Sequence, residues 1–131
     1  MSNPQQIAAL WEDLKDLVKS VVEEMNQAAE LRHRTGGLDL DFDDTGTIVI
    51  SKRSLPRMYV TVNLRPAAID IGTRMIFKGT ESVERQLWES LFIKIDEGGS
   101  KLRNKAGEAL TVDQAVYYIL RPFLHLGTLM N

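Results

Sequence analysis

The chain has 131 residues, of which 44% are hydrophobic and 26% charged, the size and balance of one globular domain with one apolar core. Its 16 basic and 18 acidic residues give a formal net charge of −2, which excludes an overall positive field toward nucleic acid or an anionic membrane. The absence of cysteine excludes disulfides, thiolate metal sites and cysteine nucleophiles, and fits a reducing compartment. Because we find neither a signal peptide nor an apolar run near the roughly 20 residues of a membrane helix, the sequence predicts a soluble, cytoplasmic protein.

A long amphipathic helix is predicted from Pro4 to Arg34. Asn3 can cap its start with Pro4 at the first helical position, and Gly36-Gly37 can end it in a left-handed turn. Apolar residues recur at spacings of three and four, as on one face of a helix. They are Ile7, Leu10, Trp11, Leu14, Leu17, Val18, Val21, Val22, Met25 and Ala29.

After Gly37 the hydrophobic period changes to two, which indicates strands. Turns are expected at Asp44-Thr45-Gly46, at Leu55-Pro56-Arg57 and at Arg65-Pro66. Connections this short exclude parallel crossovers, so the strands form an antiparallel meander. The strands expected here cover residues 38–43, 47–51, 58–64 and 69–77.

The following segment, residues 80–89, fits a helical stripe and an alternating strand equally well, and we favour a turn that leads into a strand. Residues 90–96 are predicted as a strand, Gly98-Gly99 as its turn and residues 101–110 as a returning hairpin arm. The predicted sheet therefore has five or six strands.

A second helix is predicted to begin after Thr111, since Thr111 and Gln114 form a capping-box pattern. Pro122 is expected to end or kink this helix about one turn earlier, with Gly127 beyond it. A sheet with one apolar face has to be covered, and the two amphipathic helices are the available covers. We therefore predict a single α+β domain over residues 1–131, with both helices on one face of the sheet.

The length of the first helix predicts a homodimer. About 30 residues span roughly 45 Å, whereas a strand spans about 20 Å. Part of the apolar stripe is then expected to extend past the sheet, where loops or a second copy of the chain must bury it. A bent or shorter helix that stays within one domain is the alternative.

An acidic run, Asp39, Asp41, Asp43 and Asp44, resembles the start of a calcium-binding loop. Such a loop requires glycine at its sixth position and glutamate at its twelfth, where this chain has Asp44 and Ile50. We interpret the run as a solvated strand face that discourages edge-to-edge association.

The two histidines, His33 and His125, fall at the ends of the predicted helices and have no ligand partner at helical spacing. Neither a nucleophile elbow nor a phosphate-binding loop is present, and Gly36-Gly37 and Gly98-Gly99 are typical of turns. We therefore assign no catalytic, cofactor-binding or metal residue and expect no cofactor.

Basic residues gather in the meander with Tyr59 among them, as in modules that stack single-stranded bases. A solvated surface is the favoured interpretation because the acidic strand lies alongside, so nucleic acid is not an expected partner. The basic residues are Lys52, Arg53, Arg57, Arg65, Arg74, Lys78, Lys101, Arg103 and Lys105.

Trp11 and Trp88 either line a pocket between helix and sheet or belong to the core, and the core is favoured. Tyr117 and Tyr118 are adjacent on the last helix, so at most one is expected to be fully inward.

The leading functional hypothesis is a non-catalytic binding or assembly module that self-associates, with an unidentified protein or small molecule as a further partner. One alternative is a small-molecule-binding protein or enzyme with a pocket between helix and curved sheet. The other is a weak nucleic-acid binder that uses a basic sheet face.

Overall fold

The computed structural model describes residues 3–43, 46–54, 57–76, 82–96 and 99–124. Side chains are described for these residues apart from 3–4, 75–76, 82–89, 95–96 and 99–100.

The N-terminal helical region consists of two helices, α1 (Asn3–Gln27) and α2 (Ala29–Thr35), rather than the single helix predicted. Ala28 between them has an extended backbone with φ −75° and ψ 113°. Nothing in the local sequence breaks the helix at an alanine, whereas contacts distant in sequence hold the two helices separately. Asn26 of α1 is hydrogen-bonded to Leu38 of β1, and Thr35 of α2 accepts a hydrogen bond from the Ser54 N–H, after β2. Gly36 ends α2 with φ 69°, and its N–H donates to the carbonyl of Arg32, as predicted for this turn.

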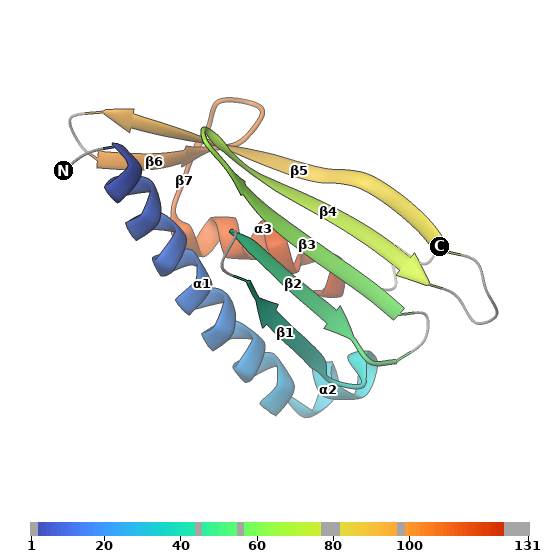
Figure 1. Ribbon diagram of the computed structural model, residues 1–131. Helices are drawn as coiled ribbons and strands as arrows, with labels where there is room; N and C mark the ends of the chain where they lie inside the picture. The colour runs from blue at the N-terminus through green and yellow to red at the C-terminus, as the bar shows by residue number, and fades with distance from the viewer. Residues whose placement is uncertain (1–2, 44–45, 55–56, 77–81, 97–98, 125–131) are drawn as a thin grey trace.

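The strands form one seven-stranded antiparallel sheet in which each strand pairs with its neighbours in the chain (Figure 1). This confirms the meander, with one strand more than the upper expectation. The segment of residues 80–89, which fitted both a helix and a strand, is a strand from Ser82 onward. The strands are β1 (Leu38–Phe42), β2 (Thr47–Lys52), β3 (Arg57–Arg65), β4 (Ala68–Ile76), β5 (Ser82–Asp96), β6 (Gly99–Arg103) and β7 (Ala109–Leu110).

The last helix, α3 (Val112–Leu124), begins with the predicted capping box. The N–H of Thr111 donates to Gln114 Oε1 at 2.9 Å, and the N–H of Gln114 donates to Thr111 Oγ1 at 3.2 Å. Of the two effects predicted for Pro122, an end or a kink of the helix, the end is wrong, because the helix continues through Pro122 to Leu124. Pro122 and Phe123 are both buried, and this burial offsets the backbone hydrogen bond that proline cannot donate.

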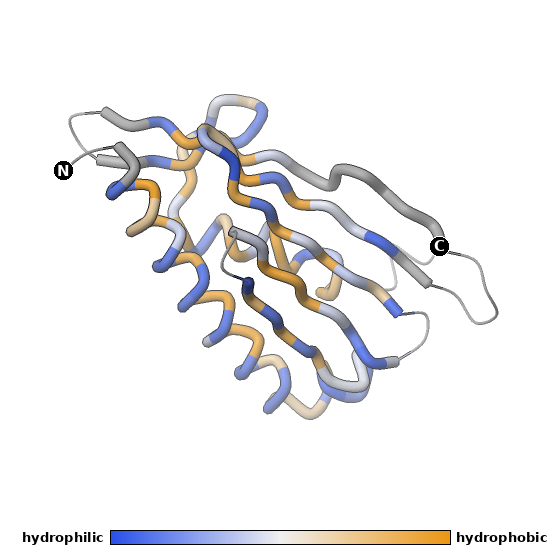
Figure 2. The backbone as a smooth tube through the Cα atoms, viewed as in Figure 1, coloured by the Kyte–Doolittle hydropathy of each residue, from blue (hydrophilic) through white to orange (hydrophobic). Residues whose placement is uncertain are grey.

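The helices pack on one face of the sheet, and α1 also contacts α3. Alternate strand residues point to this face, as the alternating colours of β2 and β3 in Figure 2 illustrate. Sheet and helices thereby share one core, as predicted. Its fully buried members include Leu14, Val18, Ile48, Ile50, Val60, Val62, Ile69, Ile71, Leu91, Ile119 and Phe123.

The apolar stripe of α1 is buried within the chain from Leu10 to Met25. Both β1 and β6 contact this helix, so the sheet covers it along its length. None of the large exposed apolar side chains among the described residues belongs to α1, which removes the expected overhang as the reason for dimerisation. The homodimer itself stays a prediction. No helix in the described ranges has the length and apolar character needed to span a bilayer.

Candidate functional site

One face of the sheet carries neither α1 nor α3, and we call it the open face (Figure 1). Its residues alternate along each strand with residues that are buried under the helices. Described members of the open face are Asp39, Asp41, Val49, Ser51, Tyr59, Thr61, Asn63, Asp70, Gly72, Arg74, Ser90, Phe92, Lys94, Lys101 and Arg103.

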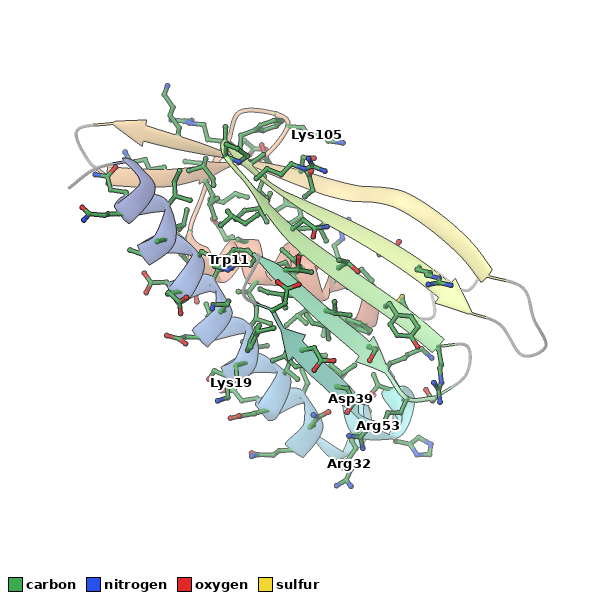
Figure 3. The ribbon with its side chains drawn as sticks, in the orientation of Figure 1. Trp11, Lys19, Arg32, Asp39, Arg53 and Lys105 are labelled. Carbon is green, nitrogen blue, oxygen red and sulfur yellow. The ribbon has the colours of Figure 1, made fainter. Side chains whose placement is uncertain are left out.

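The β1 side of the open face is acidic. Asp39 and Asp41 are exposed at alternate positions of β1, as predicted for a solvated strand. Arg53 lies against Asp39, with its Nη2 2.6 Å from Oδ1 and its Nε 3.1 Å from both carboxylate oxygens (Figure 3). These hydrogen bonds hold the pKa of Asp39 below its usual value and raise the pKa of Arg53.

The rest of the acidic run does not form a ligand shell in the described structure. Asp43 accepts a hydrogen bond of 3.0 Å from the backbone N–H of Thr47 and closes the β1–β2 turn. Asp44 lies outside the described residues. Across the part of the chain that is described, no three acidic or histidine side chains gather as a metal site.

The centre of the open face is mostly uncharged. Thr61 stands between Val49 and Gly72 in the strand register. The next pair along the sheet is also neutral, since Thr47 Oγ1 donates to Asn63 Oδ1 at 3.0 Å.

A charged cluster closes this central region on its β4 and β5 side. Arg65 forms an ion pair with Asp70, and Ser90 Oγ donates to the same carboxylate at 3.0 Å. Both carboxylate oxygens of Asp70 therefore accept a hydrogen bond, and the cluster links β3, β4 and β5.

The β5 and β6 side of the open face is basic and includes Lys94, Lys101 and Arg103. Phe92 lies among them in the register with Arg103, and 47% of its surface is exposed. Arg103 Nη1 donates to the carbonyl of Gly107 at 2.8 Å. The open face thus runs from an acidic strand to a basic strand pair, with an exposed aromatic ring on the basic side.

The predicted basic cluster is dispersed. Arg53 and Arg65 are ion-paired, and Lys78 lies outside the described residues. In the described register, Tyr59 has Arg74 opposite it, and Arg57 follows on the same face. Basic residues that are ion-paired or far apart are poorly arranged to neutralise the phosphates of a nucleic acid.

Lys52, another member of that set, lies on the opposite, helix-covered face and is only 4% exposed. Its Nζ donates at 3.2 Å to both the carbonyl and the hydroxyl oxygen of Ser54. Burial lowers the pKa of Lys52 below 10.5 because the charged form loses hydration. The burial of Lys52 could have been predicted from the alternation of β2, since Lys52 follows Ile48 and Ile50 at intervals of two.

Two surface depressions adjoin each other at the junction of α1 and α2, with volumes of about 510 and 350 Å³. Both are lined by Gln27 and Arg32, the first also by His33 and the second by Arg53. His33 lies exposed in the last turn of α2, at the end of the helical region where the sequence placed it. These side chains are on the surface, so the depressions lack the buried convergent polar groups of a typical ligand pocket.

Asn26, which also lines the smaller depression, serves a structural purpose that sequence reasoning missed. Its Nδ2 donates to the carbonyl of Leu38 at 3.0 Å, and its Oδ1 accepts the N–H of Leu38 at 2.8 Å. The side-chain amide thereby pairs with β1 as a neighbouring strand would. No periodicity marks such a residue, because it contacts a segment 12 residues away.

A third depression of about 310 Å³ lies between β7 and α3 and is lined by both tyrosines of α3. Tyr117 is 49% exposed, whereas Tyr118 packs against the core, which confirms that only one of them turns inward.

The space between the helices and the sheet is filled by apolar side chains wherever it is described. Trp11 is 5% exposed and belongs to this core, as favoured from the sequence (Figure 3). The buried polar side chains described here, Thr35, Lys52, Thr73 and Ser90, are on four different elements. The side chain of Trp88 and all of His125 lie outside the described structure.

No model of a protein family matches the chain, and neither a curated protein nor a solved structure is significantly similar to it.

Proposed function

We propose that the protein is a non-catalytic binding and assembly module that presents the open face of its sheet and associates with a second copy of itself. The observation that carries this proposal is the packing of both helices on one side, which leaves the other side of the sheet without a helix in the described part of the chain. Antiparallel sheets tolerate such a face in water, and it is then available for contacts.

The chemistry of the open face supports binding rather than catalysis. Asp39 and Asp70 are each ion-paired with an arginine, and Asp70 also accepts a hydrogen bond from Ser90, so both carboxylates are engaged in holding the sheet surface. Phe92 supplies an exposed aromatic ring beside cations, and such residues are enriched at protein interfaces. The absence of cysteine favours the cytoplasm as the place where this module works.

The proposal is tested by the mass of the full chain in solution, measured by light scattering over a wide range of concentration. We expect the mass to rise from one chain to two chains as the concentration increases. A single-chain mass at every concentration would overturn self-association. Strong thermal stabilisation by a small metabolite would instead favour the ligand-pocket alternative, because a ligand bound to the folded state raises its stability.

A further inference from the structure

Strand β5 is much longer than its outer neighbour β6. It contains 15 residues, but β6 pairs only with Phe92–Asp96. Residues 82–91 consequently form an outer rim of the described sheet, which Figure 1 shows as the long yellow strand beyond β4. At about 3.4 Å per residue this edge extends for roughly 30 Å.

The inner side of the same segment is also incompletely paired. The register with β4 joins Arg85 to Thr73 and Glu89 to Ile71, and shifts between them. The residues from Gln86 to Trp88 therefore stand opposite Gly72 alone. Groups that face β4 cannot reach a strand on the other side of β5. The outward-facing backbone N–H and C=O groups of residues 82–91 have no partner strand in the described sheet, and an added strand would supply their partners.

The two terminal strands of the sheet are less suited to self-pairing. β7 has only two residues. β1 carries Asp39 and Asp41 at alternate positions, so antiparallel pairing of two β1 strands brings carboxylates opposite or next to each other. The rim of β5 has charges of both signs and no proline.

Resting on the self-association proposed above, we infer that two copies pair antiparallel through residues 83–91 of β5, about a two-fold axis at Leu87. This register places Arg85 opposite the partner's Glu89, and symmetry repeats that pair on the other side of the axis. Opposite charges in facing positions stabilise an antiparallel pair.

Neighbouring registers are poorer. Directly opposite residues of an antiparallel pair point to the same face, so the two-fold axis falls on a residue. An axis at Gln86 places Arg85 opposite the partner's Leu87, and an axis at Trp88 places Arg85 opposite the partner's Leu91. Neither register pairs opposite charges, so charge favours the axis at Leu87.

The two-fold axis of such a pair is perpendicular to the sheet. The open faces of both copies then lie on the same side of one continuous sheet. A partner that binds the open face thereby meets two equivalent sites, and its avidity increases without a new contact.

The test is a charge exchange across the axis, with dimer dissociation measured by sedimentation and folding checked by circular dichroism. Arg85→Glu and Glu89→Arg each place like charges opposite at both symmetric positions, and each is expected to raise the dissociation constant about tenfold. The double variant restores the opposite charges and is expected to dimerise as the natural chain does. Lys19→Glu on the exposed side of α1 is the matched control and is expected to leave dissociation unchanged.

Cysteine cross-linking provides a second measurement that does not depend on charge. Because the chain has no cysteine, Leu87→Cys can link only to its own copy, and oxidation is expected to give a covalent dimer. Thr61→Cys, in the centre of the open face, reports face-to-face association and is expected to stay uncross-linked.

The outcomes separate the two proposals. A natural chain that stays monomeric overturns both the proposed function and the β5 interface. A chain that dimerises, but whose double variant does not recover and whose Leu87→Cys form does not cross-link, overturns the β5 interface and leaves self-association standing.

Discussion

At the scale of single residues, two polar side chains have structural roles that their residue types do not predict. Asn26 completes the hydrogen bonding of Leu38 at the edge of the sheet. Lys52 occupies a buried position and ties the end of β2 to Ser54. Both stabilise the junction where α1, α2 and the first hairpin meet.

Replacing Asn26 by alanine is expected to lower the free energy of unfolding by about 2–3 kcal/mol, because both backbone groups of Leu38 lose their partner. Gln27→Ala is the matched control, since Gln27 is the exposed neighbour in the same helical turn. Urea denaturation of both variants measures the difference. Equal stabilities for the two variants would contradict the role assigned to Asn26.

Because of Lys52, the free energy of unfolding is expected to increase as the pH rises into the alkaline range. Its pKa in the folded chain lies below the 10.5 expected for the unfolded chain. Between these two values the unfolded state binds more protons, so the free energy of unfolding increases with pH through that window. Lys52→Met is expected to remove this increase and to change stability at neutral pH by no more than on the order of 1 kcal/mol.

Denaturation at several pH values, compared between the two proteins, isolates this contribution, because every other titratable group is common to both. A pH profile of the methionine variant parallel to that of the natural chain would refute the assignment.

At the scale of elements, the junction of α2 with β1 depends on a close backbone approach. Gly36 has φ 69°, and a Cβ there would lie 2.9 Å from the backbone nitrogen of Ser54. The same nitrogen donates to the carbonyl of Thr35 at 2.9 Å. The helix end and the loop after β2 are thus fitted to each other.

Gly36→Ala and Gly107→Ala form a matched pair, because both positions have positive φ but a Cβ at Gly107 meets nothing within 4 Å. Both substitutions incur left-handed backbone strain of about 1 kcal/mol. Gly36→Ala is expected to cost at least about 1 kcal/mol more, since Ser54 must move. Thermal unfolding measures both, and a larger loss at Gly107 would be inconsistent with the close approach.

At the scale of the whole molecule, the sheet has one covered and one open face, and adjacent residues in a strand belong to different environments. Leu91 is fully buried, whereas Phe92 next to it is 47% exposed. The open face, together with the rim of β5, is the surface that the proposed assembly uses.

Alanine at these two neighbours is expected to have very different effects. Leu91→Ala removes buried methyl groups and is expected to cost about 3 kcal/mol, whereas Phe92→Ala is expected to cost less than about 1 kcal/mol. Urea denaturation distinguishes them. A larger loss at Phe92 would show that the faces are assigned the wrong way round.

The order of elements followed from hydrophobic period and turn chemistry. The change of period after Gly37 and the Thr111 capping box marked real boundaries, because both depend on contacts within a few residues. The strand from Ser82 was the favoured of two interpretations, since short apolar segments satisfy both periods. The candidate surfaces were harder to predict from the sequence. The predicted basic cluster was assembled without assigning each residue to a face of the sheet, and so it included the buried Lys52.

Composition and local spacing alone determined that this chain folds as a helix, an antiparallel meander and a helix, since those signals act between near neighbours. Only the tertiary structure decided where α1 stops, how far the helix continues past Pro122, and which strand leaves an unpaired edge. These features depend on contacts between segments distant in sequence, such as Asn26 with Leu38, and no local pattern encodes them.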